Sequence, residues 1–186
     1  MSTFSPLIEE VDRSGARLVG AAAASNDDQV RAPSALPAWT RGQVLVYLAR
    51  SADACTWLLR SACGHPDPGS RPDTAPPPDT AETRAETRAE SGAESGAESG
   101  AESGAELAAG VRHRLARFVE EAGSTPSDAW NRLVMALAGW RHPAWFTLRR
   151  CLRELETHHV DLCCGYRTAD WPASYVRWAL DDTFAR

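Results

Sequence analysis

Apolar residues recur three and four positions apart through most of the chain, as they do along one face of an α-helix. This spacing predicts four long amphipathic helices, at residues 5–24, 41–63, 107–122 and 143–164, and a shorter one at residues 173–184. No segment alternates apolar and polar side chains in the way that a half-buried strand does. We therefore expect an all-α protein, a four-helix bundle with a short additional C-terminal helix.

Residues at the ends of these segments indicate where two of the helices begin and end. Thr40 stands just before the second helix and Gln43 lies three positions on, a pairing in which each side chain accepts a hydrogen bond from the other residue's backbone amide. Gly165 follows the fourth helix, where a glycine commonly ends a helix in a left-handed conformation. Residues 25–37 carry no periodic pattern and predict a connector between the first two helices.

The segment 65–106 interrupts the helical pattern. It begins with a stretch rich in Pro, Gly and Asp and continues as a tetrapeptide array, two copies of Ala-Glu-Thr-Arg followed by four of Ala-Glu-Ser-Gly. A repeat of four drifts around a helix of 3.6 residues per turn, and the array has no large apolar residue whose burial could offset its ordering entropy. We expect a single domain, residues 1–186, interrupted by this disordered low-complexity insert. For residues 81–89, where Gly is absent, a frayed helix is the alternative.

Charge and cysteine content narrow the class of protein. Of the net charge of −5, residues 74–106 contribute −6, from Asp79 and seven Glu against two Arg, so the rest of the chain sums to +1. A near-neutral body lacks the basic patch that a nucleic-acid partner requires. The chain shows neither a basic leader followed by an apolar run nor an apolar stretch long enough to span a bilayer. Five cysteines without C-x-x-C spacing fit reduced thiols, so we expect a cytoplasmic protein.

The fourth predicted helix carries the candidate chemistry. Glu154, His158 and Asp161 are spaced by three or four residues and share one helical face with Cys151. A carboxylate and an imidazole one turn apart can share a metal ion, although a catalytic zinc usually takes three protein ligands. The simpler interpretation is a hydrogen bond between Glu154 and His158 that stabilises the helix. The polar residues of this helix that project elsewhere are Glu156 and His159.

Two stretches resemble the signatures of a known protein family. The first stretch is Leu36-Pro-Ala-Trp-Thr-Arg-Gly-Gln-Val-Leu-Val-Tyr-Leu-Ala-Arg-Ser-Ala-Asp53. It resembles the second-helix signature of the mycothiol-dependent maleylpyruvate isomerase family, which belongs to the DinB-like four-helix bundle superfamily. The second signature is similar to Arg153-Glu-Leu-Glu-Thr-His-His-Val-Asp-Leu162, followed by Gly165-Tyr166 and Ala169-Asp-Trp-Pro172. The resemblance covers nearly all of the chain apart from the insert, and it implies a DinB-like bundle.

In that family a divalent metal is held by a His of the second helix and by a Glu and a His four residues apart on the fourth. The resemblance assigns the last two ligands to Glu154 and His158, whereas the first falls on Tyr47. Another frequent family His falls on Gln43. A phenol must lose its proton to ligate well, which costs roughly 4 kcal/mol at pH 7. We therefore expect a degenerate metal site at Tyr47, Glu154 and His158.

The resemblance implies that zinc activates the thiol of mycothiol, and that the thiolate adds to a small electrophile in an isomerisation or an S-transfer. Two alternatives stay open. One is a metal-free bundle that binds a small molecule, or acts as a scaffold, with a cavity lined by Trp39, Trp57, Trp145 and Trp178. The other is a metal-independent isomerase or cyclase, with Glu154 or His158 as general base and Tyr47 as proton donor.

Four further expectations concern the residues around this site, the missing domain and the assembly. Cys151 and Cys55 could supply a thiolate to a rearranged metal site, although a free Cys more often acts as a small buried apolar residue. Asp161 could orient the imidazole of His158. Isomerases of the family carry an α/β domain after the bundle, and because the chain ends at Arg186 we expect its contribution to be missing and maleylpyruvate not to be the substrate. The sequence leaves the oligomeric state open, with a homodimer as one possibility.

Overall fold

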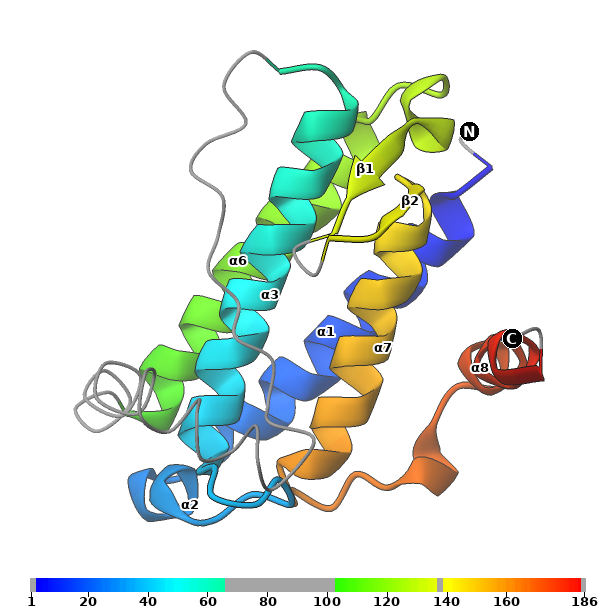
Figure 1. Ribbon diagram of the computed structural model, residues 1–186. Coiled ribbons are helices and arrows are strands. Elements are labelled where there is room, and N and C mark those ends of the chain that lie inside the picture. The colour runs from blue at the N-terminus through cyan, green and yellow to red at the C-terminus, as the bar shows by residue number, and fades with distance from the viewer. Residues whose placement is uncertain (1–2, 66–102, 137–138, 185–186) are drawn as a thin grey trace.

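The computed structural model describes residues 3–65, 103–136 and 139–184. Four long helices form its body: α1 (Ser5–Ala23), α3 (Arg41–Ala62), α6 (Gly104–Ser124) and α7 (Phe146–Asp161). They pack lengthwise against one another, and α8 (Ala173–Phe184) follows as an additional C-terminal helix (Figure 1). The prediction of an all-α four-helix bundle is therefore confirmed.

Contacts at the helix ends define the direction of α3, α6 and α7. Helices α3 and α6 run in parallel, since Gly42 at the start of α3 lies against the Leu107 side chain near the start of α6, while Cys63 after α3 lies beside Glu121 in the last turn of α6. Helix α7 runs the opposite way, because its last residue, Asp161, accepts a 2.9 Å hydrogen bond from the amide of Ala35, which precedes α3. The first half of α3 therefore faces the second half of α7, and Tyr47 meets Glu154 there.

The apolar faces of the four long helices meet in one core. Each helix contributes a side chain with no exposed surface, namely Leu18, Leu59, Phe118 and Leu148. Burying a side chain of this size stabilises the fold by about 1.5–3 kcal/mol relative to leaving it in water. The helical spacing of apolar residues therefore determines which face of each helix turns inward.

Side chains at the first turns stabilise the beginnings of α3 and α6. The Gln43 side chain accepts a 2.8 Å hydrogen bond from the amide of Thr40, and the Thr40 hydroxyl accepts a 3.2 Å bond from the amide of Gln43, as the sequence predicts. Ser103 and Glu106 form the same arrangement at the start of α6. Because the last tetrapeptide of the array supplies this cap, α6 begins at Gly104, three residues before the predicted start.

The predicted connector between the first two helices contains a short helix, α2 (Asp27–Arg31). Asn26 caps it, accepting a 2.9 Å hydrogen bond from the amide of Gln29, whose own side chain accepts one from the amide of Asn26. A five-residue helix is too short to show a hydrophobic period, which explains why the pattern missed it.

The prediction that the chain has no strands is wrong for one small hairpin. Strand β1 (Leu133–Met135) pairs in antiparallel fashion with β2 (Arg141–Pro143). Each strand has three residues, too few to reveal an alternation of period two. Since β2 uses Pro143, α7 begins only at Phe146, later than predicted.

The end of α7 also differs from the prediction. The helix ends at Asp161, and the residue that turns the chain in a left-handed conformation is Cys163, with a φ of 51°. Gly165 adopts a positive φ two residues later, so it belongs to the loop and not to the helix terminus. This loop leads through a short 3₁₀ turn, η2 (Thr168–Asp170), to α8.

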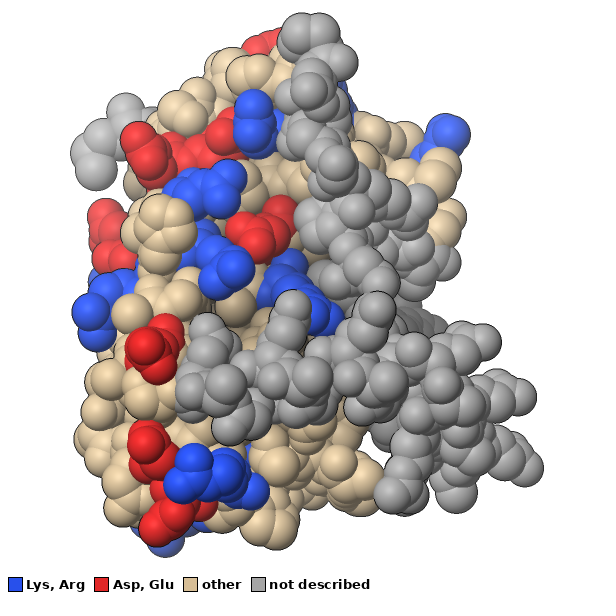
Figure 2. Space-filling view, turned by 90° about the vertical axis from the view of Figure 1, so that its left-hand side faces the viewer, with Lys and Arg blue, Asp and Glu red and all other residues tan. Residues whose placement is uncertain are grey.

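Acidic and basic side chains are intermixed on the face that Figure 2 shows, without one sign dominating an area. Such a surface agrees with the near-neutral charge expected of the body. Within the described ranges, no helix is both long and apolar enough to cross a membrane. Most of the predicted low-complexity insert, residues 66–102, lies outside the described residues.

Candidate active site

Helices α3 and α7 bring together the three residues that the sequence singled out. The Tyr47 hydroxyl of α3 donates a 2.8 Å hydrogen bond to Oε2 of Glu154 on α7. Nε2 of His158, one helical turn further along α7, lies 3.3 Å from the same carboxylate oxygen. The two antiparallel helices thus place a phenol, a carboxylate and an imidazole in one cluster.

His158 lies between two carboxylates. Its Nδ1 is 2.8 Å from Oδ2 of Asp161, so Asp161 orients the ring as expected, while Nε2 faces Glu154. Tyr47 approaches the imidazole edge-on, with ring centroids 5.1 Å apart. Burial alone would lower the pKa of His158, but hydrogen bonds and charges of Glu154 and Asp161 outweigh it and raise this pKa above the ordinary value of 6.5. The two carboxylates therefore favour the protonated form of the imidazole.

The pKa values of Glu154 and Tyr47 are shifted in opposite directions. Burial would raise the pKa of Glu154, but the hydrogen bonds from His158 and Tyr47 and the imidazolium charge lower it. Burial raises the pKa of Tyr47, and the neighbouring Glu154 carboxylate raises it further. At neutral pH Glu154 is consequently ionised, and Tyr47 keeps its proton and donates it in a hydrogen bond.

These donors do not fit the metal that the family resemblance implies. Glu154 and His158 could each offer one ligand atom, but the Tyr47 oxygen carries a firmly held proton directed at Glu154. A zinc site needs a third protein ligand at this position. In the described part of the chain, no set of three His, Cys, Asp or Glu ligand atoms gathers around Glu154.

The two cysteines near this cluster do not complete such a site. Cys55 of α3 and Cys151 of α7 are both buried. A hydrogen bond with Cys55, together with burial, raises the pKa of Cys151 well above its ordinary value. Its thiol therefore stays protonated, and packing accounts for both residues.

A pocket of about 50 Å³ lies beside the cluster, between α3 and α7. Tyr47 and Glu154 line it, and Arg150 provides a positive charge at its wall. The expectation that four tryptophans surround the cavity is wrong, since none of them lies in its wall. The remaining lining residues are Ser51, Ala54, Cys55, Leu58 and Thr147.

A second polar cluster of α7 was missed from the sequence. Glu156 has no exposed surface and accepts hydrogen bonds from Ser14 and Arg17 of α1 and from the Tyr166 hydroxyl, at 2.5, 2.8 and 2.5 Å. His159 is also buried and stacks on the Tyr166 ring with centroids 3.9 Å apart. The expectation that these two α7 residues project away from the candidate face is correct, but they project into a buried interface. Nothing in the sequence identified Ser14 and Arg17 as their partners.

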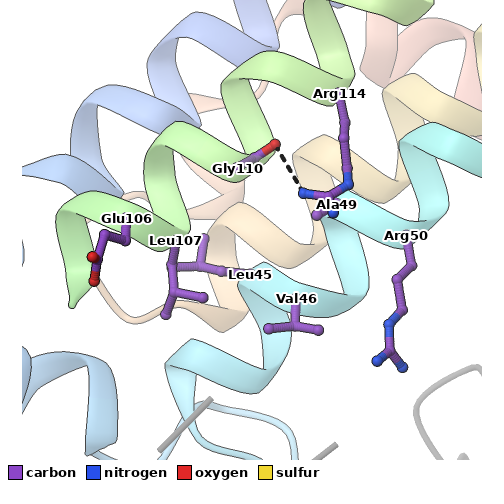
Figure 3. A pocket seen from close by; sticks show the side chains of 8 residues that line it. All are labelled: Leu45, Val46, Ala49, Arg50, Glu106, Leu107, Gly110 and Arg114. Carbon is purple, nitrogen blue, oxygen red and sulfur yellow. Dashed lines mark hydrogen bonds between the residues drawn. The ribbon is translucent and has the colours of Figure 1, made fainter. Parts of the chain in front are cut away.

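A larger pocket of about 420 Å³ lies between α3 and α6 (Figure 3). Its polar groups come from Arg50, Glu106 and Arg114, and Arg114 donates a 3.4 Å hydrogen bond to the carbonyl of Gly110. No Cys, His or Tyr lines this pocket. The smaller pocket beside Glu154 is thus the better candidate for chemistry, because its wall contains a carboxylate, a phenol and a cation.

Comparisons with known proteins agree with this architecture. Residues 11–163 match a family model described as the mycothiol maleylpyruvate isomerase N-terminal domain. Two solved structures share the fold, a mycothiol-dependent maleylpyruvate isomerase and a histidine-to-alanine mutant of such an isomerase. Each aligns with a TM-score of 0.72 at 22% sequence identity, over 95% of this chain and 70% of the isomerase chain. No curated protein sequence matches this one.

Proposed function

The chain belongs to the mycothiol maleylpyruvate isomerase N-terminal domain family, and we propose that it is a member whose site performs acid–base chemistry without the family's metal. The observation that carries this proposal is the 2.8 Å hydrogen bond from Tyr47 to Glu154. It occupies the carboxylate oxygen that also faces His158, so the phenol takes the place of a third metal ligand without being one.

In this proposal Glu154 is the general base. Its Oε2 is engaged by Tyr47 and His158, and Oε1 forms no hydrogen bond within the described residues, so that Oε1 can accept a proton from a molecule in the pocket. The pKa of Glu154 is lowered, which makes it a weak base suited to a carbon acid whose proton is already acidic. His158 positions and polarises the carboxylate through its contact with Oε2.

Tyr47 and Arg150 suit the other half of such a reaction. Once Glu154 has taken the proton, its negative charge no longer holds the Tyr47 hydroxyl, which can then donate to the oxygen of an enolate. Arg150, in the wall of the same pocket, fits an anionic group on the substrate. The substrate class is therefore a small 2-oxo acid. Glu154 removes a proton from the carbon next to the carbonyl and returns it to the resulting enolate, either at oxygen to give the enol or at a conjugated carbon to give an isomer.

The family description names mycothiol and an isomerase, and so favours a second candidate, a thiol-dependent isomerase. The sequence resemblance adds zinc and the possibility of an S-transferase to this candidate. The two candidates differ in whether Tyr47 or a metal occupies the space beside Glu154. Zinc content, measured per chain after saturation and gel filtration, separates them. We expect Tyr47→His to hold one more zinc than the wild type, because the substitution completes a set of three ligands.

The control is Glu154→Gln, introduced both alone and together with Tyr47→His. It should remove the additional zinc from the Tyr47→His protein and leave the zinc content of the wild type unchanged. A loss of zinc from the wild type on Glu154→Gln would mean that the native site holds metal, and the proposal would be wrong.

Proton removal by Glu154 is tested by a separate measurement. Exchange of the C3 protons of short 2-oxo acids in heavy water, followed by NMR, reports proton removal without requiring the natural substrate. We expect Glu154→Gln to slow the exchange by roughly 100-fold or more, the usual contribution of a general base. Equal rates for Glu154→Gln and the wild type would exclude Glu154 as the base.

A further inference from the structure

A second group of metal-ligating side chains lies at the opposite end of α3 from Tyr47. Cys63 and His65 follow the last turn of α3, and Glu121 belongs to the last turn of α6. One ligand atom from each lies within 4.8 Å of the other two. The sixteen residues from Tyr47 to Cys63 correspond to about 24 Å of helix, so this group is separate from the candidate active site.

The backbone after α3 brings these residues together. The amide of Cys63 bonds to the carbonyl of Leu59 at 3.0 Å, and the amide of His65 bonds back to the carbonyl of Arg60 at 3.2 Å. Gly64 between them has a φ of 74°, a left-handed conformation that costs a glycine little. This turn directs the His65 imidazole toward α6, where its Nε2 lies 3.9 Å from Oε1 of Glu121.

The electrostatic surroundings suit a cation. Helices α3 and α6 run in parallel and both end here, so the partial negative charges of two helix C-termini add to that of Glu121. Arg132 is an opposing charge that acts on Cys63, but its guanidinium is engaged by the carbonyl of Ala62 at 3.0 Å and by Asp128 at 2.5 Å. A metal would therefore meet more negative than positive charge at this end of the bundle.

We propose that Cys63, His65 and Glu121 bind a zinc ion that fastens the end of α3 to the end of α6. A thiolate, an imidazole and a carboxylate are each good zinc ligands, and water would complete the tetrahedron. Ligands around a tetrahedral zinc lie roughly 3.5 Å apart, so the atoms must close by about 1 Å. The His65 side chain, which is 45% exposed, can rotate to do this.

Binding would also change the protonation of Cys63. Burial raises the pKa of this thiol, and the Glu121 charge contributes to the rise, so without metal the sulfur keeps its proton at neutral pH. Forming the zinc–sulfur bond replaces the sulfur–hydrogen bond, and the proton leaves to solvent. Zinc affinity at this site should consequently increase with pH.

Cobalt(II) is the probe for the experiment, because a cobalt–thiolate bond gives an intense near-ultraviolet absorption that oxygen and nitrogen ligands do not. We expect the wild type to show this band and Cys63→Ser to lack it. Glu121→Gln and His65→Gln should weaken cobalt binding by at least about tenfold, since even residues behind the ligands have effects of that size. Cys163→Ser, which removes an exposed thiol elsewhere, and Glu154→Gln, in the candidate active site, should leave the band unchanged.

Three results would overturn the proposal: absence of the band from the wild type, its persistence in Cys63→Ser, or its loss in Glu154→Gln. His65→Gln protects the test against misfolding, because that side chain lies at the surface and its loss should leave the metal-free melting temperature unchanged. Zinc should raise the melting temperature of the wild type and not that of His65→Gln.

Discussion

Arg17 of α1 and Glu156 of α7 form an ion pair with 2.8 Å between Nη2 and Oε1, and the carboxylate has no exposed surface. A buried carboxylate requires compensation, because removing it from water costs several kcal/mol. Arg17 supplies the charge, and the hydroxyls of Ser14 and Tyr166 supply two further hydrogen bonds. This cluster joins α1, α7 and the loop that leads to α8.

Loss of the guanidinium should leave the Glu156 charge buried without a cation. We expect Arg17→Met to lower the free energy of unfolding by about 3 kcal/mol, measured by urea denaturation. The matched control is Arg13→Met on the same helix, where Arg13 pairs with Glu9 at 3.7 Å and both side chains are 62% exposed. That exposed pair should contribute less than about 1 kcal/mol. Similar small losses for both variants would show that Arg17 is not needed to compensate Glu156.

Asp161 should determine the titration of His158. Because the two carboxylates raise the pKa of His158 above 6.5, the stability that they provide is fully present below pH 6.5 and is lost as the pH rises through the folded-state value. Asp161→Asn removes one of these charges, and NMR titration of the imidazole should show a lower pKa. Asp53→Asn, which breaks a 2.9 Å pair with Arg114 on α6, should leave that titration unchanged. If Asp161→Asn had no effect, Asp161 would not act on the ring.

His159 should produce the opposite pH dependence. Burial lowers its folded-state pKa to about 4, against 6.5 when unfolded, so between these values the unfolded chain binds more protons. Stability should therefore fall as the pH drops from 6.5 to about 4, by up to about 3 kcal/mol from this residue. The comparison is the slope of unfolding free energy against pH for the wild type and His159→Gln. We expect the variant to have a shallower slope, and an unchanged slope would show that His159 is not the titrating group.

Two glycines should respond in opposite ways to the same substitution. A methyl group at Gly104 would lie 2.6 Å from the carbonyl oxygen of Ser25 and 2.9 Å from the Val30 side chain, so Gly104→Ala should destabilise by more than about 1 kcal/mol. Gly20 lies in α1 with nothing within 4 Å of such a methyl group, and Gly20→Ala should stabilise by about 0.5–1 kcal/mol. Thermal denaturation of both variants tests the close contact between α6 and the loop before α2. Stabilisation by both would mean that this contact is looser than described.

The sequence by itself determined the features that depend on near neighbours in the chain. Apolar spacing revealed the long helices, and Thr40 with Gln43 marked the start of α3, because a helix cap involves residues three positions apart. The one-turn spacing of Glu154 and His158 likewise placed both on one face of α7. The resemblance to a family then indicated that residue 47 should lie opposite this face. Elements of three to five residues, namely α2, β1 and β2, escaped prediction because they are shorter than one clear period.

Only the tertiary structure decided what each polar group contacts. Tyr47 and Glu154 are 107 positions apart, and the direction of the phenol's proton toward the carboxylate depends on how α3 and α7 are aligned. Glu156 meets Arg17 across 139 positions. Cys63 meets Glu121 because α3 and α6 run in the same direction. Periodicity specifies which face of a helix is buried. The rotation and direction of the neighbouring helix follow from the packing of the whole core, and this packing therefore determines the partners of buried polar groups.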